Sequence, residues 1–291
     1  MEIEKTYIKD VQHLVPCPTI AIQVLTMAQN IECDLVGLAA KIEQDPSLCA
    51  NMLRVANSAY FGHTKAITSI KDIIVRLGVE TVKLLAITGA SVGLLKSPQE
   101  AYNLSSGALW RHSWATAVMA GIIGRYAELE DNSAVYTSAL LHDIGKVILN
   151  RSLQAELNNR PPPDPNITIA EFERLVLGTN HARVGMALLQ SWDLPDKITL
   201  PVGLHHDRTQ AESSLLYARI VYLANYLTES MGIHSIDPEN YFFNVQEYVE
   251  RETNLPNVPN FDVNMEKIIE EFFVQYSQSQ SIFSTSGDPT A

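Results

Sequence analysis

The chain has 291 residues, of which 46% are hydrophobic and 19% are charged, a composition sufficient for a large buried core. A formal charge of −12 argues against a nucleic-acid-binding surface, which needs basic patches. The apolar stretches are too short to span a bilayer, so no membrane association is expected. The first residues do not resemble a secretory signal, and three cysteines without CxxC spacing favour reduced thiols, so we expect a cytoplasmic protein.

Helical patterns dominate the sequence from end to end. Asp45-Pro46 predicts a helix start, with Asp45 as N-cap and Pro46 in the first helical position. Thr168 and Glu171 have the spacing of a capping box and predict a helix through Leu177. No segment alternates with period two for long, so the predicted class is all-α. Further helices are expected at residues 18–29, 34–44, 79–94, 106–128, 138–149, 180–191, 196–205, 213–230 and 262–276.

Breaks in these patterns suggest how the chain is organised. Residues 1–95 are expected to form a first helical lobe, which ends at the turn-rich segment 96–100. Residues 105–230 form the second lobe, interrupted by a proline-rich loop at 161–165. Residues 231–276 are expected to be a C-terminal helical extension. The Ser/Gln/Thr-rich segment 277–291 predicts a disordered tail.

An adjacent pair, His142-Asp143, lies in the apolar run 138–149. Apolar residues at helical spacing predict that the pair sits in a buried helix. An imidazole and a carboxylate there must be paired, hydrogen-bonded or bound to metal, because desolvating them alone is costly. Other histidines near apolar helical segments could converge on the pair and form a metal site: His112, His181, His205 and His206, with His234 a weaker candidate.

Each candidate also has a structural interpretation. A lone His-Asp pair in a helix is more often structural than a ligand pair. His205-His206 could be a solvated helix end, and His181 could merely cap a helix. Lys146 is either a cation that faces phosphate or a solvent-exposed lysine. His13, His63 and His234 have no evident partners and are expected at the surface.

The segment from His142-Asp143 through Gly145-Lys146 resembles the signature of the HD superfamily of metal-dependent phosphohydrolases. The first lobe is similar to the HDOD family, an HD-related output domain of bacterial signalling proteins. This resemblance covers residues 10–210 and implies an all-helical, two-lobed regulatory domain with a signalling protein as partner. The motifs that carry it are residues 14–18 (Leu-Val-Pro-Cys-Pro), 42–48 (Ile-Glu-Gln-Asp-Pro-Ser-Leu), 54–60 (Arg-Val-Ala-Asn-Ser-Ala-Tyr) and 77–78 (Leu-Gly).

Residues 112–225 also resemble the HD-GYP branch, whose members bind two or three metals and cleave cyclic dinucleotides. Asn225 stands where the superfamily has an aspartate, Ala108 stands near the branch's glutamate, and no Gly-Tyr-Pro follows Asp207. The resemblance therefore implies one well-held metal and a second, weak one. The complete position would use Asp143, His181, His205 and His206, and the weakened one His112, His142, Asp143 and Asn225. This donor set suits iron, manganese, nickel or zinc.

Two functions compete on this basis. The first is a bacterial signalling module that retains a metal but has little catalysis, which the missing ligands favour. The second is a metal-dependent phosphohydrolase acting on a nucleotide-like phosphate ester or cyclic dinucleotide, which the nearly full ligand set favours. Asp143 would then orient the attacking water and Lys146 would hold phosphate. A plain helical scaffold leaves the histidines unexplained. The regulatory module is the preferred hypothesis, with a phosphate-containing small molecule as a candidate ligand.

Overall fold

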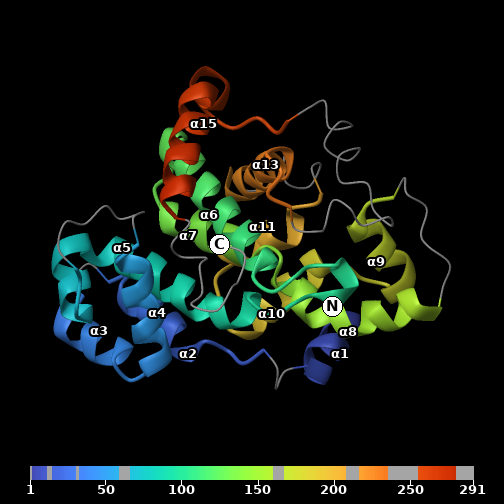
Figure 1. The fold of residues 1–291 in the computed structure, drawn as a ribbon, viewed down its shortest axis with the longest axis horizontal. Helices are drawn as coiled ribbons and strands as arrows, with labels where there is room; N and C mark the ends of the chain where they lie inside the picture. Colours follow the sequence, from blue (N-terminus) through green and yellow to red (C-terminus); the bar gives the residue numbers. More distant parts are fainter. Residues whose placement is uncertain are drawn as a thin grey trace. The chain divides into compact units, whose positions relative to one another are not determined.

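The computed structural model describes residues 2–11, 15–30, 33–58, 66–159, 167–207, 216–234 and 255–279. These segments are α-helices joined by turns and one short 3-10 helix (Figure 1). The described residues contain no strand beyond an isolated bridge between Gln99 and Leu104. The all-α prediction is confirmed. Among the described helices, none has the length and apolar character needed to cross a membrane.

The chain forms two compact units, each defined by the contacts among its own residues. The first unit comprises residues 1–16 and 94–268, and the second comprises residues 17–93 and 269–291. The lobe boundaries expected from the sequence stay a prediction. The proline-rich loop at 161–165 lies outside the described residues. Helix α15 (Phe261–Gln278) runs past the expected start of the tail at 277, and residues 280–291 also lie outside the described part.

The second unit contains α2 (Thr19–Met27), α3 (Leu35–Ile42), α4 (Pro46–Ala56) and most of α5 (Ile70–Leu95). The first three begin within one residue of their predicted starts, whereas α5 begins at Ile70 and not at the predicted residue 79. The N-cap prediction for Asp45 is confirmed, because its carboxylate accepts hydrogen bonds from the amides of Ser47 and Leu48, both at 3.0 Å. Within α5, Gly78 adopts φ 78° and ψ 167°, so the helix is kinked there. This kink explains why the pattern predicted a helix only from residue 79.

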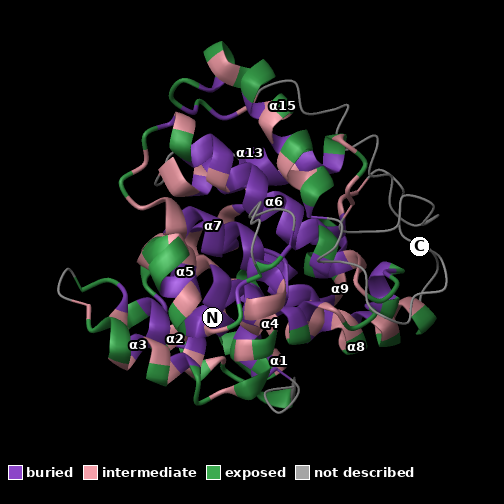
Figure 2. Ribbon diagram, turned by 60° about the vertical axis from the view of Figure 1, so that its left-hand side comes forward, coloured by how far each residue is buried: buried purple, intermediate pink, exposed green. Residues whose placement is uncertain are grey.

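The first unit is built around helices that are buried on nearly every side (Figure 2). The helices of this unit are α1 (Glu2–Val11), η2 (Glu100–Tyr102), α6 (Ala108–Tyr126), α7 (Asn132–Leu141), α8 (Ile144–Asn159), α9 (Ile169–Leu177), α10 (His181–Ser191), α11 (Asp196–Leu204) and α13 (Leu216–Ser230). Helix α6 packs against α7 and α13, and α10 packs against α8 and α11. The capping box of α9 is confirmed, with Thr168 and Glu171 bonded reciprocally.

The prediction of a single helix over residues 138–149 is wrong. Helix α7 ends at Leu141 and α8 begins at Ile144, so His142 and Asp143 form the turn between two helices. Apolar residues are buried on both sides of this turn, and the apolar spacing therefore runs through it without a visible break. Asp143 directly precedes α8, where a carboxylate is favoured by the amide groups and dipole of a helix N-terminus.

Candidate metal centre

The five predicted histidine ligands converge on the sixth ligand, Asp143, which belongs to two clusters of potential donors. The His181 cluster contains Asp143, His181, His205 and His206, and the His112 cluster contains His112, His142 and Asp143. Within each cluster the donor atoms lie within 4.8 Å of one another. His112 comes from α6 and His181 opens α10, while His205 and His206 directly follow α11.

A close approach of α8 and α10 brings His181 to Asp143. Gly145 lies in the first turn of α8, and a Cβ atom there would collide with the backbone carbonyl of His181. The backbone amide of Gly185 is also close to that Cβ position. The two helices therefore need glycine at 145 to pack at this distance.

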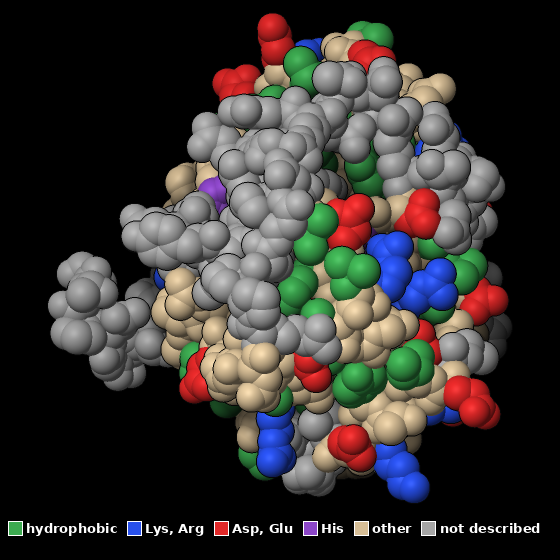
Figure 3. Space-filling model, turned by 90° about the vertical axis from the view of Figure 1, so that its right-hand side faces the viewer, with side chains coloured by type: hydrophobic (Ala, Val, Ile, Leu, Met, Phe, Trp, Pro, Cys, Tyr) green, Lys and Arg blue, Asp and Glu red, His purple; other side chains and the backbone are tan. Residues whose placement is uncertain are grey.

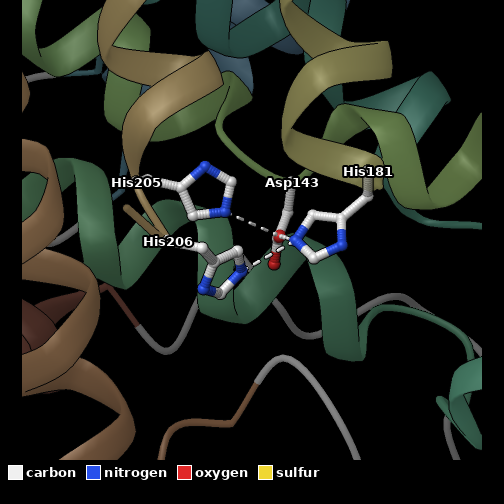
Figure 4. A group of neighbouring side chains, drawn as sticks. All are labelled: Asp143, His181, His205 and His206. Atoms are coloured by element: carbon white, nitrogen blue, oxygen red, sulfur yellow. Dashed lines mark hydrogen bonds and ion pairs between the residues drawn. The ribbon is translucent and has the colours of Figure 1, made fainter. Parts of the chain in front are cut away.

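The His181 cluster contains polar atoms without hydrogen-bond partners. Oδ1 of Asp143 lies 3.2 Å from Nε2 of His181 and 3.6 Å from Nε2 of His205, and the two Nε2 atoms of His181 and His206 are 2.9 Å apart (Figure 4). The Asp143 Oδ1 and His205 Nε2 atoms are buried and make no hydrogen bond in the described part of the chain. Burying such atoms unpaired is costly, and a cation between them would satisfy them.

Partners outside this cluster fix the orientation of its imidazoles. Nδ1 of His181 lies 2.7 Å from Oε2 of Glu173, and Nδ1 of His205 lies 2.6 Å from the carbonyl oxygen of Val202. When each Nδ1 donates its proton to that acceptor, Nε2 presents a lone pair toward Asp143. A carboxylate or carbonyl behind a histidine is the usual arrangement around metal-binding imidazoles.

In the His112 cluster, both ring nitrogens of His112 and of His142 lie within hydrogen-bond distance of a polar atom. Nε2 of His112 lies 3.1 Å from Nε2 of His142 and 3.0 Å from Oδ1 of Asn225. The carbonyl oxygens of Ile233 and Ala139 lie 2.7 and 2.6 Å from Nδ1 of His112 and of His142, respectively. Asn225 thus directs an oxygen into the cluster but brings no negative charge.

Lys146 is fully buried, so its interpretation as a solvent-exposed lysine is wrong. Its Nζ lies 2.8 Å from Oδ2 of Asp143 and 5.6 Å from the centre of the Tyr102 ring. The Tyr102 hydroxyl donates a hydrogen bond of 2.6 Å to Oε1 of Glu173, the carboxylate that also orients His181. The Lys146 ammonium group therefore pairs with Oδ2 of Asp143, the carboxylate oxygen that also lies near His142. The other oxygen, Oδ1, faces the His181 cluster.

Glu173 and Tyr102 were missed by sequence reasoning. Glu173 lies four residues from both Ile169 and Leu177 on α9, so it interrupts an apolar face. A charged residue at such a position signals a buried partner. The sequence carries no comparable signal for Tyr102, because its contact with Glu173 joins η2 to α9.

The buried environment sets the protonation of the donors. Burial lowers the pKa of His205 to about 3, and burial also lowers the pKa values of His112 and His206. These imidazoles are therefore neutral near pH 7 and keep a lone pair. Burial opposes ionisation of Asp143, but the Lys146 ammonium and contacts from His142 and His181 hold its pKa well below the usual value.

The remaining histidines do not join either cluster in the described part of the chain. Nδ1 of His234 lies 2.9 Å from Oε2 of Glu229, and the His234 side chain is partly buried rather than fully exposed. His13 and His63 lie outside the described residues.

The chain is similar to known proteins in sequence and in structure. Residues 14–208 match the HDOD domain family. An uncharacterized protein of Treponema pallidum (strain Nichols) is 27% identical over 197 residues, covering 67% of this chain. The match covers only 38% of that relative, so this chain corresponds to less than half of it.

Several solved structures share the fold. An HDOD domain protein of unknown function from Geobacter sulfurreducens has a TM-score of 0.71 and 21% identity, over 96% of this chain and 97% of that one. A candidate phosphohydrolase from Shewanella amazonensis has a TM-score of 0.70 and 19% identity, over 95% and 96%. A candidate signal transduction protein from Marinobacter aquaeolei has a TM-score of 0.68 and 21% identity, over 94% and 59%.

Proposed function

Since this chain belongs to the HDOD domain family, we propose that it is a bacterial signalling module that holds one transition-metal ion firmly and has little catalytic activity. The observation that carries this proposal is the difference between the two clusters. The His181 cluster has four donors, two of which are buried atoms that make no hydrogen bond to any described residue. The His112 cluster has an amide where a carboxylate would be needed, and a lysine bound to the shared Asp143 oxygen.

The donor set of the His181 cluster fits a transition-metal ion. Three imidazoles and one carboxylate are too rich in nitrogen for magnesium or calcium, and they suit iron, manganese, nickel or zinc. Asp143, His181, His205 and His206 would hold the ion, with Glu173 behind His181. A second ion in the His112 cluster would compete with the Lys146 ammonium for Asp143 and would be held weakly.

A metal-dependent phosphohydrolase is the second candidate function, favoured by the complete donor set of the His181 cluster. When bound, the ion would supply Lewis-acid chemistry for cleavage of a phosphate ester. Asp143, which stays ionised, would accept or orient a proton on the attacking water. The Lys146 ammonium is already bound to Asp143, and this contact argues against its use as a free phosphate-binding cation.

Elemental analysis tests the proposed metal site. The protein is purified without chelators and without an affinity tag that binds metal, and it is expected to carry about one transition-metal ion per chain. His206→Ala should lose most of this metal. His234→Ala is the matched control, because His234 lies outside both clusters and should leave the metal content unchanged. A metal-free wild-type protein that also fails to bind added manganese, iron or zinc would overturn the proposal.

An activity assay separates the two functions. The metal-loaded protein is assayed with manganese or iron against cyclic dinucleotides and simple phosphodiesters. We expect little or no turnover, because two-metal hydrolysis depends on a second ion that the His112 cluster would hold weakly. Robust turnover that disappears in Asp143→Ala would make this chain an enzyme. The signalling partner and the cytoplasmic location stay predictions.

A further inference from the structure

A cavity of about 580 Å³ lies beside the His181 cluster. Side chains of α9, α10 and α11 line it, together with His206 and Asp207, which follow α11. His206 belongs both to the cavity wall and to the cluster, where its Nε2 lies 2.9 Å from Nε2 of His181. A volume of this size suits a small organic molecule better than a lone ion.

Two arginines on the cavity wall are available for a ligand. Arg174 comes from α9 and Arg183 from α10, and both side chains are exposed. Within the described ranges, neither guanidinium group has an ion-pair or hydrogen-bond partner. On the side of this unit where α8 and α9 lie, basic side chains gather beside hydrophobic ones (Figure 3). Two arginines on the wall of one cavity favour an anion with several oxygens, such as phosphate.

The acidic residues of the wall are already engaged. Oε2 of Glu171 accepts hydrogen bonds from the Thr168 amide at 2.7 Å and the Thr168 hydroxyl at 3.0 Å, in the capping box of α9. Asp207 also has interactions of its own within the protein. These hydrogen bonds direct the Glu171 carboxylate toward the start of α9, whereas the two guanidinium groups have no partner in the described residues.

The cavity also has apolar surface for the rest of a ligand. Met186 of α10 and Leu200 and Leu204 of α11 contribute apolar side chains to its wall. Inorganic phosphate would leave this surface uncovered, whereas an organic group attached to the phosphate would bury it. The combination of cations and apolar wall thus fits a phosphate monoester better than a free ion.

We propose that this cavity binds a small organic phosphate, with the phosphate held by Arg174 and Arg183 and the organic part packed on the apolar wall next to His206. This inference rests on the proposed function, because the ligand would be the small molecule to which the signalling module responds. It assigns the anion-binding role to these two arginines instead of the buried Lys146, which does not line the cavity.

Calorimetric titration of the full chain tests the proposal. The protein is used with the metal it carries after purification, its metal content is measured, and release of inorganic phosphate is followed so that turnover is not mistaken for binding. Three probes are compared: phenyl phosphate, benzoate and inorganic phosphate. Phenyl phosphate should bind most tightly. Benzoate should bind about tenfold more weakly because it carries less charge, and inorganic phosphate should also bind more weakly because it lacks the apolar ring.

Arginine variants locate the site. Arg174→Gln and Arg183→Gln should each raise the Kd for phenyl phosphate about tenfold, and the double variant about a hundredfold. Arg151→Gln is the matched control, because Arg151 is an exposed residue of α8 that does not line the cavity, and it should leave the Kd unchanged. All three positions are exposed, so folding should be preserved; circular dichroism checks this.

Several outcomes would overturn the inference. It fails if phenyl phosphate does not bind, if the double variant binds it as the wild type does, or if benzoate or inorganic phosphate binds as tightly as phenyl phosphate. These failures differ from a failure of the proposed function. Loss of phenyl phosphate binding with about one metal ion per chain would refute only the cavity assignment. Arginine-dependent binding to a protein that takes up no metal would refute only the metal site.

Discussion

At the scale of single residues, Asn225 is the clearest departure from a centre with two metal ions. Its side-chain oxygen lies 3.0 Å from Nε2 of His112, where a carboxylate would add a charged donor. We expect Asn225→Asp to raise the metal content from about one to about two ions per chain, measured by elemental analysis after dialysis against manganese. Asn150→Asp makes the same chemical change outside both clusters and should have no effect. An unchanged metal content in Asn225→Asp would contradict this account of the His112 cluster.

Glu173 is predicted to strengthen metal binding without touching the ion. Its carboxylate lies 2.7 Å from Nδ1 of His181, and this contact increases the donor strength of the opposite nitrogen. Glu173→Gln removes the charge while keeping the size of the side chain. We expect the metal Kd, measured by competition with a chelator of known affinity, to rise about 10- to 100-fold.

Glu171→Gln is the matched control for this prediction. It is the same change on the same helix, but Glu171 serves the capping box and not the imidazoles. It should leave the metal Kd within about twofold of the wild-type value. Equal effects of the two variants would mean that Glu173 acts through the stability of α9 and not through His181.

The six ligand residues could be predicted from the sequence because the family motifs name them in order. That they meet around Asp143 follows from the fold, whereas their role as metal ligands stays a prediction. The residues that hydrogen-bond or pair with these ligands, such as Glu173 and Lys146, could not be predicted in the same way. Glu173 reaches His181 only because the turn at 178–180 folds α10 back beside α9. The pairing of Lys146 with Asp143 depends on burial, which the sequence left open.

At the scale of helices, the junction of α8 and α10 tolerates only glycine at position 145. A Cβ atom there would collide with the His181 carbonyl, which belongs to a rigid helix start and cannot move aside easily. We expect Gly145→Ala to lower the free energy of unfolding by about 1–3 kcal/mol, measured by denaturant titration. It should also weaken metal binding, because relieving the collision displaces His181.

Gly121→Ala in α6 is the control for this substitution. The nearest atom to a Cβ atom at 121 would be 3.7 Å away, an ordinary contact distance. Alanine there should be neutral or stabilising by up to about 1 kcal/mol, because it favours the helix over the unfolded chain. If Gly145→Ala behaved like Gly121→Ala, the close approach of α8 and α10 would not be a constraint.

The start of α7 is stabilised by Asp131. Its carboxylate accepts hydrogen bonds from the Ala134 amide at 3.1 Å and the Ser133 hydroxyl at 2.7 Å, and it pairs with Lys197 of α11. Burial alone would raise the pKa of Asp131, but the contacts with Lys197 and Ser133 outweigh it and lower the pKa below its usual 3.8. A carboxyl with a lowered pKa stabilises the fold above its unfolded-state pKa, and this contribution is lost as the pH falls through the folded-state value.

Asp131→Asn tests this contribution because asparagine keeps the cap but loses the charge. We expect the variant to be less stable than the wild type near pH 7 by up to about 1 kcal/mol, since the ion pair is partly exposed. The difference should shrink as the pH falls below about 4, in unfolding curves recorded side by side. A difference that stays constant with pH would show that the charge of Asp131 contributes nothing.

Helix positions could be predicted where caps or apolar faces mark them, as for α4 and α9. Helix α1 was missed, because charged residues at both ends obscure its apolar positions. The first part of α5 was missed because Gly78 interrupts the pattern. At the junction of α7 and α8 the error was an added helical turn. Buried apolar residues continue through the junction, so the sequence predicted one helix where there are two.

At the scale of the whole molecule, the candidate metal centre belongs entirely to the first unit. All three tryptophans, Trp110, Trp114 and Trp192, are also in that unit, so tryptophan fluorescence follows its unfolding alone. His112, His142 and His205 are fully buried there. An ion that binds such a site binds the native state only, and its binding free energy therefore adds to the stability of this unit.

Metal removal should therefore lower the melting temperature reported by tryptophan fluorescence. With free metal at about 100 times Kd, the native state gains about 2.7 kcal/mol, which corresponds to a Tm shift of roughly 5–10 °C for a unit of this size. Chelator should abolish the shift, and His206→Ala should reduce it sharply because a donor is lost from the His181 cluster. His234→Ala should keep it, since His234 contacts Glu229 and neither cluster. A tryptophan-monitored Tm that does not change between chelator and saturating manganese, iron or zinc would show that the buried clusters are stable without an ion, and the unpaired Asp143 oxygen would then have to be satisfied by water.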